Sequence, residues 1–355
     1  MRVLFSTTYY SPYVSGLTLY VKRLAEELVQ LGHDVTVLCM RHDKSLPEEE
    51  VINSVKIIRA DPLFKISKGF VAADWVVKSW QEGVRADVII VNLPQVEGWI
   101  PAIMARKKVV AVYHCEVDLP NKLVQKTLEF FNWISLVVAD IVVTYTEDYG
   151  KNNRLLKGFE NKTKYIYPPI PQPGGDLKIK KTKGEIWIGV AARLAEEKGI
   201  EYLLEALPDI PGKVVIAGPM EPVGEEEYKN KIMKLVEKCK NRVMFLGTID
   251  PEKMGGFYKL IDVLVLPSVN STEAFGMVQV EAMMCGVPVV ASDLPGVRVP
   301  IQKTGMGIVV PVKNSSAIAE ATTKILKNKG NYIKNKNMIT KEFAYEEIFR
   351  EILGT

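Results

Sequence analysis

Along the chain, short continuous apolar runs alternate with stretches in which apolar residues recur at helical spacing. The first run is Arg2 to Ser6, and the helical repeat that begins at Leu17 ends at Gly32. Asp34 to Cys39 forms the next apolar run. A strand, a loop, a helix and a strand in this order build a parallel sheet, whose ligand loops lie at the carboxyl ends of the strands.

The alternation predicts two series of strands, separated by a stretch with no periodicity. The first series continues near Val55–Ile58, Val88–Val91, Val109–Tyr113 and Ile141–Thr144. The second comprises Ile186–Val190, Val214–Ala217, Val243–Leu246, Val263–Leu266, Val287–Ala291 and Gly307–Val310. Between them, Pro168 to Gly175 holds four prolines and two glycines in eight residues, a composition typical of a linker.

We therefore predict an α/β fold with two Rossmann-like domains that face each other across a cleft. The first domain is residues 1–169, and the second is residues 170–334. A last amphipathic helix, Lys341 to Leu353, contains apolar residues that need a surface, and we expect residues 335–355 to pack back on the first domain.

Composition and charge narrow the class of protein. A chain of 355 residues suits two domains of ordinary size. The net charge of +4 is spread along the chain, which allows anionic partners but does not favour nucleic acid. Four separated cysteines without CxxC spacing indicate neither a zinc site nor a disulfide framework, and no apolar segment resembles an export signal or spans a bilayer. We expect a cytoplasmic protein.

Two carboxylates stand out in the stretch from Pro267 to Ser292. Glu281 lies in a helix, Gly276 to Met284, that is apolar nearly all round, and a buried carboxylate needs a donor such as a bound polyol. Glu273 precedes that helix, whose first free N–H groups form an anion site. The structural alternative is a helix-capping Glu273 and a Glu281 paired with an arginine.

A second motif carries two cationic residues. Arg193 and Lys198 follow a predicted strand and precede the next helix, where they oppose its dipole. A bound diphosphate would reverse the sign of that interaction, because arginine offers a planar fork and lysine a movable point charge. Surface pairing with Glu196, Glu197 or Glu201 is the equally weighted alternative.

The first half carries weaker signals. Gly16 at a helix start allows close approach of a phosphate, although a lone glycine is more often a turn, and no GxGxxG or GxxxxGK[ST] occurs. His114 follows a predicted strand, where it is either a site residue or a satisfied structural donor. The segment Phe64 to Trp80 combines basic residues with large aromatic residues. Contact with a lipid headgroup or an apolar acceptor is one interpretation, and a loop followed by a helix that packs its tryptophans inward is the favoured one.

With these residues in place, the chain resembles the retaining, nucleotide-sugar-dependent glycosyltransferases of the GT-B fold, family four. The motifs that carry the resemblance are ARLAEEKGIEYLLEAL, IDVLVLPS and TEAFGMVQVEAMMCGVPVVAS, with R-L-x-x-x-K-G and E-x7-E as the specific pair. The resemblance implies that Arg193 and Lys198 bind the donor diphosphate and that Glu281 binds the ribose hydroxyls. It further implies that the donor sugar is held by Glu273 and by the amides of Ala274, Phe275, Gly276 and Met277. Gly16 would contact the phosphate, and His114 would lie beside the transferred sugar. The base would be flanked by Gly247, Thr248 and Ile249.

Two positions depart from the family pattern. The usual first glycine of the first loop is Ser15 here, and the usual Asn-Gly after the interdomain strand is Pro168 and Pro169. Neither change touches the cationic pair or the two glutamates.

The resemblance implies hexosyl transfer from a nucleotide diphosphate sugar to a hydroxyl of a glycan, small polyol or lipid carrier. The anomeric configuration would be retained, by a front-face route in which the leaving phosphate helps to deprotonate the acceptor. No DxD occurs, so we expect no cofactor and no essential metal, with the two cations in the metal's role. A nucleotide-sugar epimerase or hydrolase and a non-catalytic sugar-nucleotide binding protein are the alternatives. Acceptor recognition is expected in the first domain, with peripheral membrane contact as one form; its candidates are Tyr9, Tyr10, Tyr13, Phe64 and Trp75.

Overall fold

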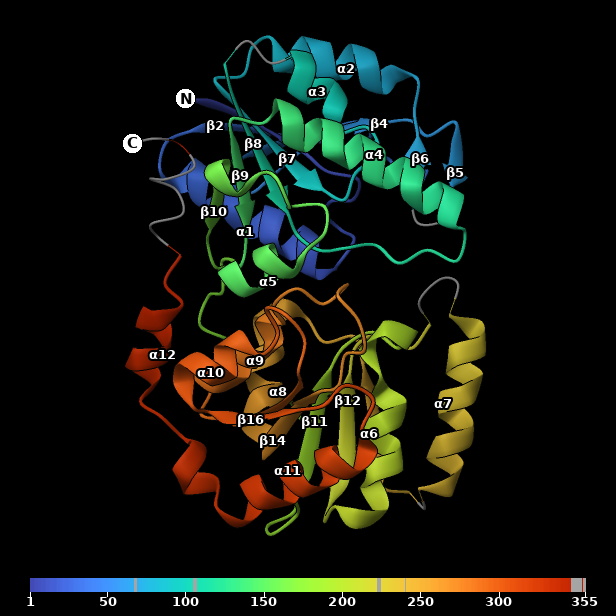
Figure 1. Ribbon diagram of the computed structural model, residues 1–355, viewed down its shortest axis with the longest axis vertical. Helices are drawn as coiled ribbons and strands as arrows, with labels where there is room; N and C mark the ends of the chain where they lie inside the picture. The colour runs from blue at the N-terminus through green and yellow to red at the C-terminus, as the bar shows by residue number, and fades with distance from the viewer. Residues whose placement is uncertain (67–68, 105–106, 222–224, 240, 346–352, 354–355) are drawn as a thin grey trace. The chain divides into compact units, whose positions relative to one another are not determined.

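The computed structural model describes residues 1–66, 69–104, 107–221, 225–239, 241–345 and 353. The chain separates into two compact units, Met1–Pro169 with Tyr345–Thr355, and Ile170–Ala344. Each unit is built on its own sheet, with helices connecting successive parallel strands (Figure 1).

The first unit contains a sheet of eight strands in the order β10-β9-β8-β7-β1-β2-β4-β3. Its strands are β1 (Arg2–Ser6), β2 (Asp34–Met40), β3 (Glu49–Ile52), β4 (Val55–Ala60), β7 (Val88–Leu93), β8 (Lys108–Tyr113), β9 (Ile141–Thr144) and β10 (Thr163–Tyr165). All pairs are parallel except β3 with β4, and a separate hairpin joins β5 (Phe64–Ile66) and β6 (Gly69–Val71). Every residue of β7 is buried, as expected of a central parallel strand covered on both faces.

Within the described ranges, five α-helices connect these strands. They are α1 (Gly16–Gln30), α2 (Asp74–Gly83), α3 (Trp99–Met104), α4 (Lys122–Val138) and α5 (Glu147–Asn152), with a 3-10 turn η1 (Glu160–Lys162). Ser15 begins α1 with a capping box: its Oγ accepts the Thr18 N–H at 3.2 Å, and Thr18 Oγ1 accepts the Ser15 N–H at 2.8 Å. The serine that departs from the family pattern therefore fixes the start of the first helix.

The second unit contains a fully parallel sheet of six strands in the order β13-β12-β11-β14-β15-β16. The strands are β11 (Trp187–Ala191), β12 (Lys213–Ala217), β13 (Val243–Gly247), β14 (Val263–Leu266), β15 (Val289–Ser292) and β16 (Gly307–Val310). The strand order reverses between β11 and β14. In open α/β sheets, this point opens a crevice at the carboxyl ends of the strands, where ligands bind.

Helices of the second unit lie in the connections between its strands and after the last strand. They are α6 (Ile200–Ala206), α7 (Glu226–Lys238), α8 (Met254–Leu260), α9 (Met277–Met284), α10 (Val299–Thr304), α11 (Ser315–Lys327) and α12 (Lys336–Glu342). Short 3-10 turns are η2 (Glu196–Lys198), η3 (Leu207–Asp209), η4 (Pro251–Lys253) and η5 (Lys329–Tyr332). None of the helices in the described ranges is long and apolar enough to cross a membrane.

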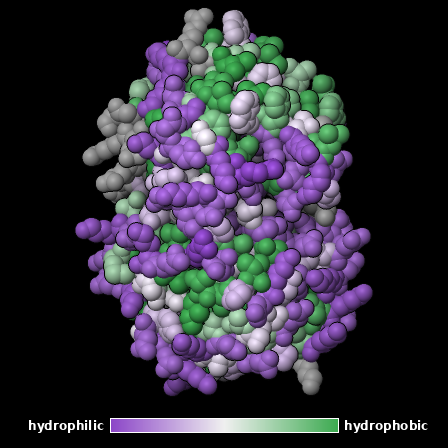
Figure 2. Space-filling view, viewed as in Figure 1, coloured by the Kyte–Doolittle hydropathy of each residue, from purple (hydrophilic) through white to green (hydrophobic). Residues whose placement is uncertain are grey.

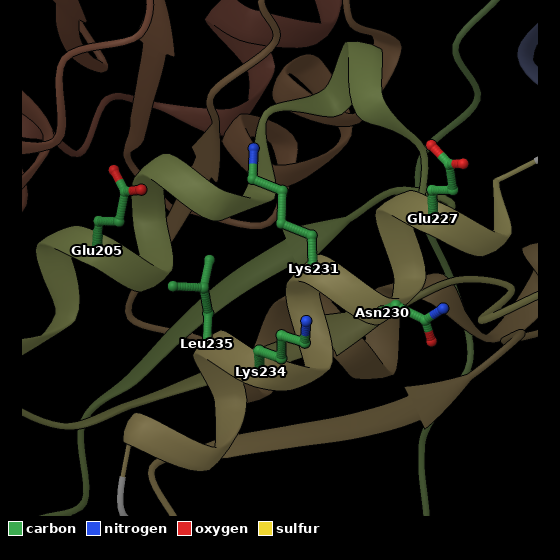
Figure 3. A pocket seen from close by; sticks show the side chains of 6 residues that line it. All are labelled: Glu205, Glu227, Asn230, Lys231, Lys234 and Leu235. Carbon is green, nitrogen blue, oxygen red and sulfur yellow. The ribbon is translucent and has the colours of Figure 1, made fainter.

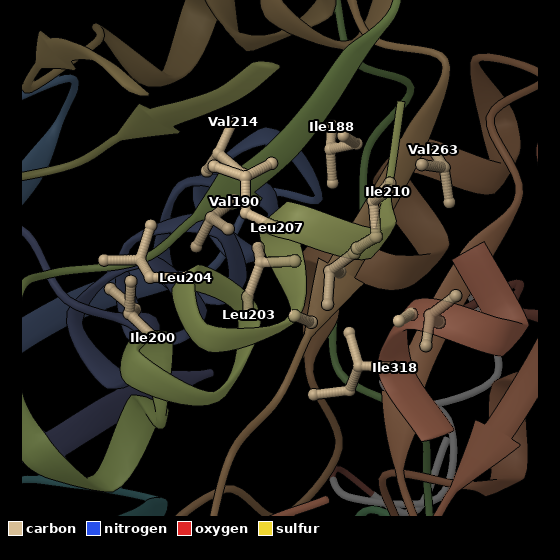
Figure 4. Packing of buried hydrophobic residues seen from close by; sticks show 14 of the residues in the cluster. Ile188, Val190, Ile200, Leu203, Leu204, Leu207, Ile210, Val214, Val263 and Ile318 are labelled. Carbon is tan, nitrogen blue, oxygen red and sulfur yellow. The ribbon is translucent and has the colours of Figure 1, made fainter. Parts of the chain in front are cut away.

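The core of the second unit lies between its sheet and helices α6, α7 and α11. Ile188 and Val263 on adjacent strands pack with Leu203 of α6 and Ile318 of α11, and all four side chains are almost inaccessible to solvent (Figure 4). Because β11 and α6 are both anchored in this core, the loop that joins them has fixed ends.

The end of the chain differs from the prediction. Residues 335–344 belong to the second unit, where α12 packs on α9 and the buried Phe343 ring lies 6.0 Å from the Phe275 ring. The apolar surface that Phe343 requires is thus within its own unit, and the expected boundary at residue 334 is not where the units divide. The rest of the predicted last helix lies almost wholly outside the described residues.

Candidate functional site

The two sequence motifs of the second unit follow the two strands at which the sheet order reverses. Arg193 and Lys198 lie in the connection from β11 to α6, and Glu273 precedes α9 in the connection from β14. Sequence spacing of 75 residues separates Lys198 from Glu273, yet the sheet topology places both at one crevice. The fold therefore brings the cationic and acidic motifs together.

The two connections are joined by three contacts. Lys198 Nζ donates to Glu273 Oε2 at 2.7 Å, and the Val269 N–H donates to the Glu197 carbonyl at 3.0 Å. Gly199 adopts φ +59°, and a Cβ there would lie 2.3 Å from the Pro267 carbonyl oxygen. Only glycine fits this close approach, which fixes Lys198 relative to the second motif.

Arg193 forms an ion pair with Glu197, one turn further along the chain. This is the surface pairing that the sequence offered as an alternative for the arginine. Lys198 does not follow that alternative, because its partner is Glu273 of the other motif. Side-chain exposure falls from 35% at Arg193 to 20% at Lys198, so the lysine is the more enclosed cation.

Helix α9 is buried over most of its surface, as its apolar sequence predicts, and it carries Glu281. That carboxylate is 7% exposed and accepts the Tyr258 hydroxyl at 2.7 Å. A tyrosine from α8 is thus one partner of this buried carboxylate. Glu273 forms no cap on α9: the N-cap is Gly276, in the left-handed conformation, with no side-chain hydrogen bond.

Gln279 is a site residue that the sequence interpretation missed. Its buried side-chain amide donates to the Phe275 carbonyl at 2.8 Å and to the Val297 carbonyl at 3.0 Å. These bonds fix the turn at Gly276, where a Cβ would lie 2.5 Å from Leu266 Cδ2. A single amide in a helix whose other polar residue is Glu281 was the available signal. The buried Ala274 and Phe275 and the half-buried Met277 complete this turn.

The predicted base-flanking segment begins where β13 ends. Gly247, in the left-handed region at φ +68°, accepts the Gly218 N–H through its carbonyl at 2.8 Å. Thr248 is exposed and Ile249 is half-buried, both at the carboxyl end of β13. They lie on the same edge of the sheet as the connection that carries Lys198.

In the first unit, His114 is held inside a polar network at the carboxyl ends of β1, β7 and β8. Its Nε2 lies 2.9 Å from Asn92 Oδ1, and its Nδ1 contacts the Tyr145 hydroxyl. The Asn92 amide nitrogen donates to the Ser6 carbonyl at 3.1 Å, which turns the amide oxygen toward the histidine. His114 Nε2 therefore carries the proton, and Nδ1 accepts from Tyr145.

Burial keeps this histidine neutral. His114 is 3% exposed, the Tyr20 ring lies against it at 4.7 Å between centroids, and burial lowers the pKa of His114 to about 3. Both ring nitrogens are thus satisfied within the unit, as in the structural alternative that the sequence offered, and the role of His114 at the site stays a prediction. The position suits a neutral hydrogen-bonding group rather than a proton carrier.

Tyr20 Oη and Gln95 Nε2 are buried beside this network and lack a hydrogen-bond partner within the described part of the chain. The same holds for the buried Glu97 Oε1, two residues after Gln95. Gln95 is linked to the network because its Oε1 accepts the Ser6 hydroxyl at 2.8 Å. Unsatisfied buried polar groups are uncommon in folded proteins and cluster at functional sites. The sequence interpretation did not select these residues, because none forms a recognisable motif.

Glu97 gives a prediction about stability. Burial raises the pKa of Glu97 from 4.5 to about 7, so the folded state holds its proton while the unfolded state ionises. Stability is therefore lost as pH rises from about 4.5 to 7, by up to about 3 kcal/mol. Glu97→Gln is expected to match the parent near pH 5 and to be the more stable protein near pH 8 in thermal unfolding.

The matched control is Glu49→Gln, whose side chain is 61% exposed on the edge strand β3. It is expected to leave the difference in stability between pH 5 and pH 8 as in the parent. An unchanged pH dependence in Glu97→Gln would contradict the assignment.

The acceptor candidates separate into two groups. Tyr10 and Trp75 are core residues, with 2% and 0% exposure. Tyr9 and Tyr13 stack at 4.4 Å between centroids, and Tyr13 is 43% exposed. Phe64 is also exposed, on the β5–β6 hairpin. Gly16, the first residue of α1, follows the connection that carries the two stacked tyrosines.

A hollow in the second unit lies elsewhere (Figure 3). It is lined by Glu205 of α6 and by Glu227, Asn230, Lys231, Lys234 and Leu235 of α7. None of the predicted donor residues lines it. Across the described ranges, no three His, Cys, Asp or Glu side chains gather as metal ligands.

Comparison with known proteins matches both halves of the chain to family models. Residues 14–171 match the model described as Glycosyltransferase Family 4, and residues 176–345 match the model described as Glycosyl transferases group 1. The chain is 30% identical to an uncharacterized glycosyltransferase of Methanocaldococcus jannaschii, covering 100% of this chain and 97% of the relative. It is 26% identical to the D-inositol 3-phosphate glycosyltransferase of Corynebacterium jeikeium, covering 88% of this chain and 83% of the relative.

Solved structures share the fold. Sucrose-phosphate synthase of Thermosynechococcus elongatus superposes with a TM-score of 0.80 at 21% identity, covering 99% of this chain and 97% of that chain. Anabaena HepE in complex with UDP-glucose gives a TM-score of 0.79 at 22% identity, covering 100% of this chain and 98% of that chain. These likenesses confirm the predicted architecture of two Rossmann-like domains.

Proposed function

The chain belongs to the glycosyl transferases group 1, and from this we propose that it moves a hexosyl group from a nucleotide diphosphate sugar to a hydroxyl acceptor. The anomeric configuration is retained and no metal ion is essential. The observation that carries the proposal is the Lys198–Glu273 pair at 2.7 Å, because it unites the cationic and acidic motifs at the point where the strand order reverses.

The donor diphosphate binds to Arg193 and Lys198. Both cations are held by carboxylates in the structure, Arg193 by Glu197 and Lys198 by Glu273. A diphosphate brings more negative charge than one carboxylate and accepts bidentate bonds from arginine. The N–H groups at the start of α9 supply further donors for an anion or a sugar oxygen.

Glu281 binds the ribose hydroxyls. One of its oxygens accepts the Tyr258 hydroxyl, and a carboxylate can accept several hydrogen bonds, including those from the polyol donors that a ribose offers. The solved structure of HepE holds UDP-glucose, and its shared fold supports a donor of the same chemical class. Gly247, Thr248 and Ile249, at the carboxyl end of β13, flank the base.

The reaction exchanges one bond at the anomeric carbon for another. The bond from that carbon to the β-phosphate oxygen breaks with its electron pair on the phosphate, and a bond to the acceptor oxygen forms on the same face. The acceptor proton passes to the leaving diphosphate. Lys198 and Arg193 stabilise the negative charge that develops there, which is the role that a divalent metal has in other transferases.

The first unit supplies the sugar and acceptor contacts. His114 lies beside the transferred sugar as a neutral ring whose two nitrogens are bonded to Asn92 and Tyr145, and Tyr9 and Tyr13 offer aromatic faces to an acceptor ring. Relatives are named for D-inositol 3-phosphate and for phosphatidyl-myo-inositol. A polyol or a lipid-linked hydroxyl is therefore the acceptor class that we propose.

The experiment is a thermal-shift screen of UDP-, GDP- and ADP-linked sugars in the presence of a chelator. A donor present at about 100 times its Kd adds about 2.7 kcal/mol to the stability of the folded state and raises Tm by several degrees. The same donor, incubated with polyol and lipid-linked acceptors, is expected to yield a glycoside of unchanged anomeric configuration, as read by NMR.

Each outcome bears on one part of the proposal. If no sugar nucleotide raises Tm, the donor assignment fails. If a divalent ion is required for turnover, metal independence fails. Release of free nucleotide at the same rate with and without acceptor would indicate the hydrolase or epimerase, and binding without turnover would indicate a sugar-nucleotide binding protein.

A further inference from the structure

Three helices of the first unit form an outer layer that carries a large exposed apolar surface. Helix α3 packs against both α2 and α4. The exposed residues, called here the apolar face, are Val76, Val77 and Trp80 of α2, Ile103 of α3, and Leu123, Phe130, Trp133 and Val137 of α4. Their exposed fractions run from 45% to 75%, and hydrophobic residues gather over these helices in the upper part of Figure 2.

Helix α4 shows that this surface is patterned. Leu123, Lys126, Phe130, Trp133 and Val137 recur at helical spacing and form one stripe along its outer side. The Phe130 and Trp133 rings stack at 6.4 Å between centroids. An ordinary surface helix has charged residues on its outer side, so an apolar outer stripe indicates a partner.

The inner side of α4 already has its own packing. Leu136 and Ser135 are fully buried, and the Asn132 carboxamide oxygen accepts the Gln95 N–H at 3.1 Å. Trp99 of α3 stacks on Phe131 at 5.9 Å. The outer stripe is therefore additional to the contacts that fold the unit.

The charges around the stripe favour a lipid surface over a second protein copy. Lys126 lies within the stripe and no acidic residue falls on the stripe itself, while Lys122 at its amino end forms an exposed ion pair with Asp118 at 2.9 Å. Lysine stems can lie along apolar surface while their ammonium groups reach headgroup phosphates. Exposed tryptophans are enriched at the interface between lipid and water. A twofold contact centred on the stripe would instead bring two copies of Lys126 together, which opposes dimerisation.

We propose that the apolar face docks this protein on a membrane that contains anionic lipids, with α4 lying in the plane of the headgroups. Trp80, Phe130 and Trp133 enter the boundary between headgroups and acyl chains, and Lys122 and Lys126 contact the lipid phosphates. This proposal is independent of glycosyl transfer, because lipid binding is measured without donor or acceptor.

The test is flotation of the full chain with vesicles of phosphatidylcholine alone or mixed with phosphatidylglycerol. The parent is expected to float with the mixed vesicles, and more weakly with phosphatidylcholine or at high salt. Phe130→Ser and Trp133→Ser each remove an aromatic side chain that the membrane would bury, and each is expected to weaken vesicle binding by about tenfold or more. Lys126→Glu is expected to reduce binding to the mixed vesicles selectively.

The matched control is Leu31→Ser, at the end of α1, where Leu31 is 57% exposed and Phe130 is 55% exposed. It is expected to float like the parent, and unchanged thermal unfolding checks that every variant is folded. The proposal is overturned if the parent does not bind mixed vesicles, or if Phe130→Ser and Trp133→Ser bind as the parent does. It is equally overturned if the parent is a dimer in sedimentation that these two substitutions convert to a monomer.

Discussion

Lys198→Ala is expected to lower turnover by about 10²–10³-fold, the usual cost of losing one preorganised donor to a developing negative charge. Lys198 is 20% exposed and held at 2.7 Å from Glu273, so its ammonium group is positioned before the donor binds. The loss is expected mainly in kcat, because the charge on the leaving diphosphate grows as the bond to the sugar breaks. Initial rates of transfer at saturating donor measure it.

Lys213→Ala is the matched control for this prediction. Lys213 is 24% exposed and forms an ion pair with Glu185 at 3.3 Å, which resembles the setting of Lys198. It lies at the first residue of β12 and hence at the amino edge of the same sheet, opposite to the proposed site. Its removal is expected to leave kcat within about twofold of the parent, because none of the residues that we predict to bind the sugar nucleotide lies at that edge. Equal losses in Lys198→Ala and Lys213→Ala would contradict the assignment of the site.

Glu281→Gln is expected to weaken donor binding by about 10–100-fold. Hydrogen bonds to a charged group contribute about 1.5–3 kcal/mol, and the substitution keeps the shape of the side chain while removing its charge and one acceptor. Calorimetry with the nucleoside diphosphate measures the change. For a nucleoside diphosphate with a dideoxyribose, the variant and the parent are expected to bind equally weakly, because this analogue lacks the hydroxyls that would donate hydrogen bonds to Glu281.

Glu201→Gln provides the control, because Glu201 is also a buried carboxylate of the second unit that accepts a tyrosine hydroxyl. It is 3% exposed, and its partners are Tyr228 and Lys231 of α7, outside the predicted donor residues. Both variants are expected to lose stability, but only Glu281→Gln is expected to lose donor affinity. If the two variants bind the nucleoside diphosphate equally well, Glu281 does not contact the ribose.

Several elements could be predicted from the sequence because local pattern and burial agree there. Continuous apolar runs become parallel strands, as in β7, since strands covered on both faces have no polar side. Helix α9 follows in the same way from an apolar surface on all sides. The edge strands β3 and β10 and the β5–β6 hairpin were missed, because short strands at an edge carry little of that pattern.

The last segment shows where the pattern is insufficient. The periodicity at Phe343 predicts a buried side chain, and Phe343 is buried. Which surface buries it depends on packing over distance, and the structure places Phe343 against Phe275 within the second unit. Periodicity describes one face of a helix and contains no information about the element opposite it.

The sequence by itself determined the two series of strands, the positions of the motifs and their charges, because these depend on neighbouring residues and on the type of each side chain. Only the tertiary structure decided that Lys198 pairs with Glu273 while Arg193 pairs with Glu197, that a tyrosine satisfies Glu281, and that Trp75 is buried while Trp80 is exposed. Each of these outcomes depends on which strands and helices become neighbours. The strand order sets that neighbourhood, and contacts between residues far apart in the chain cannot be read from local spacing.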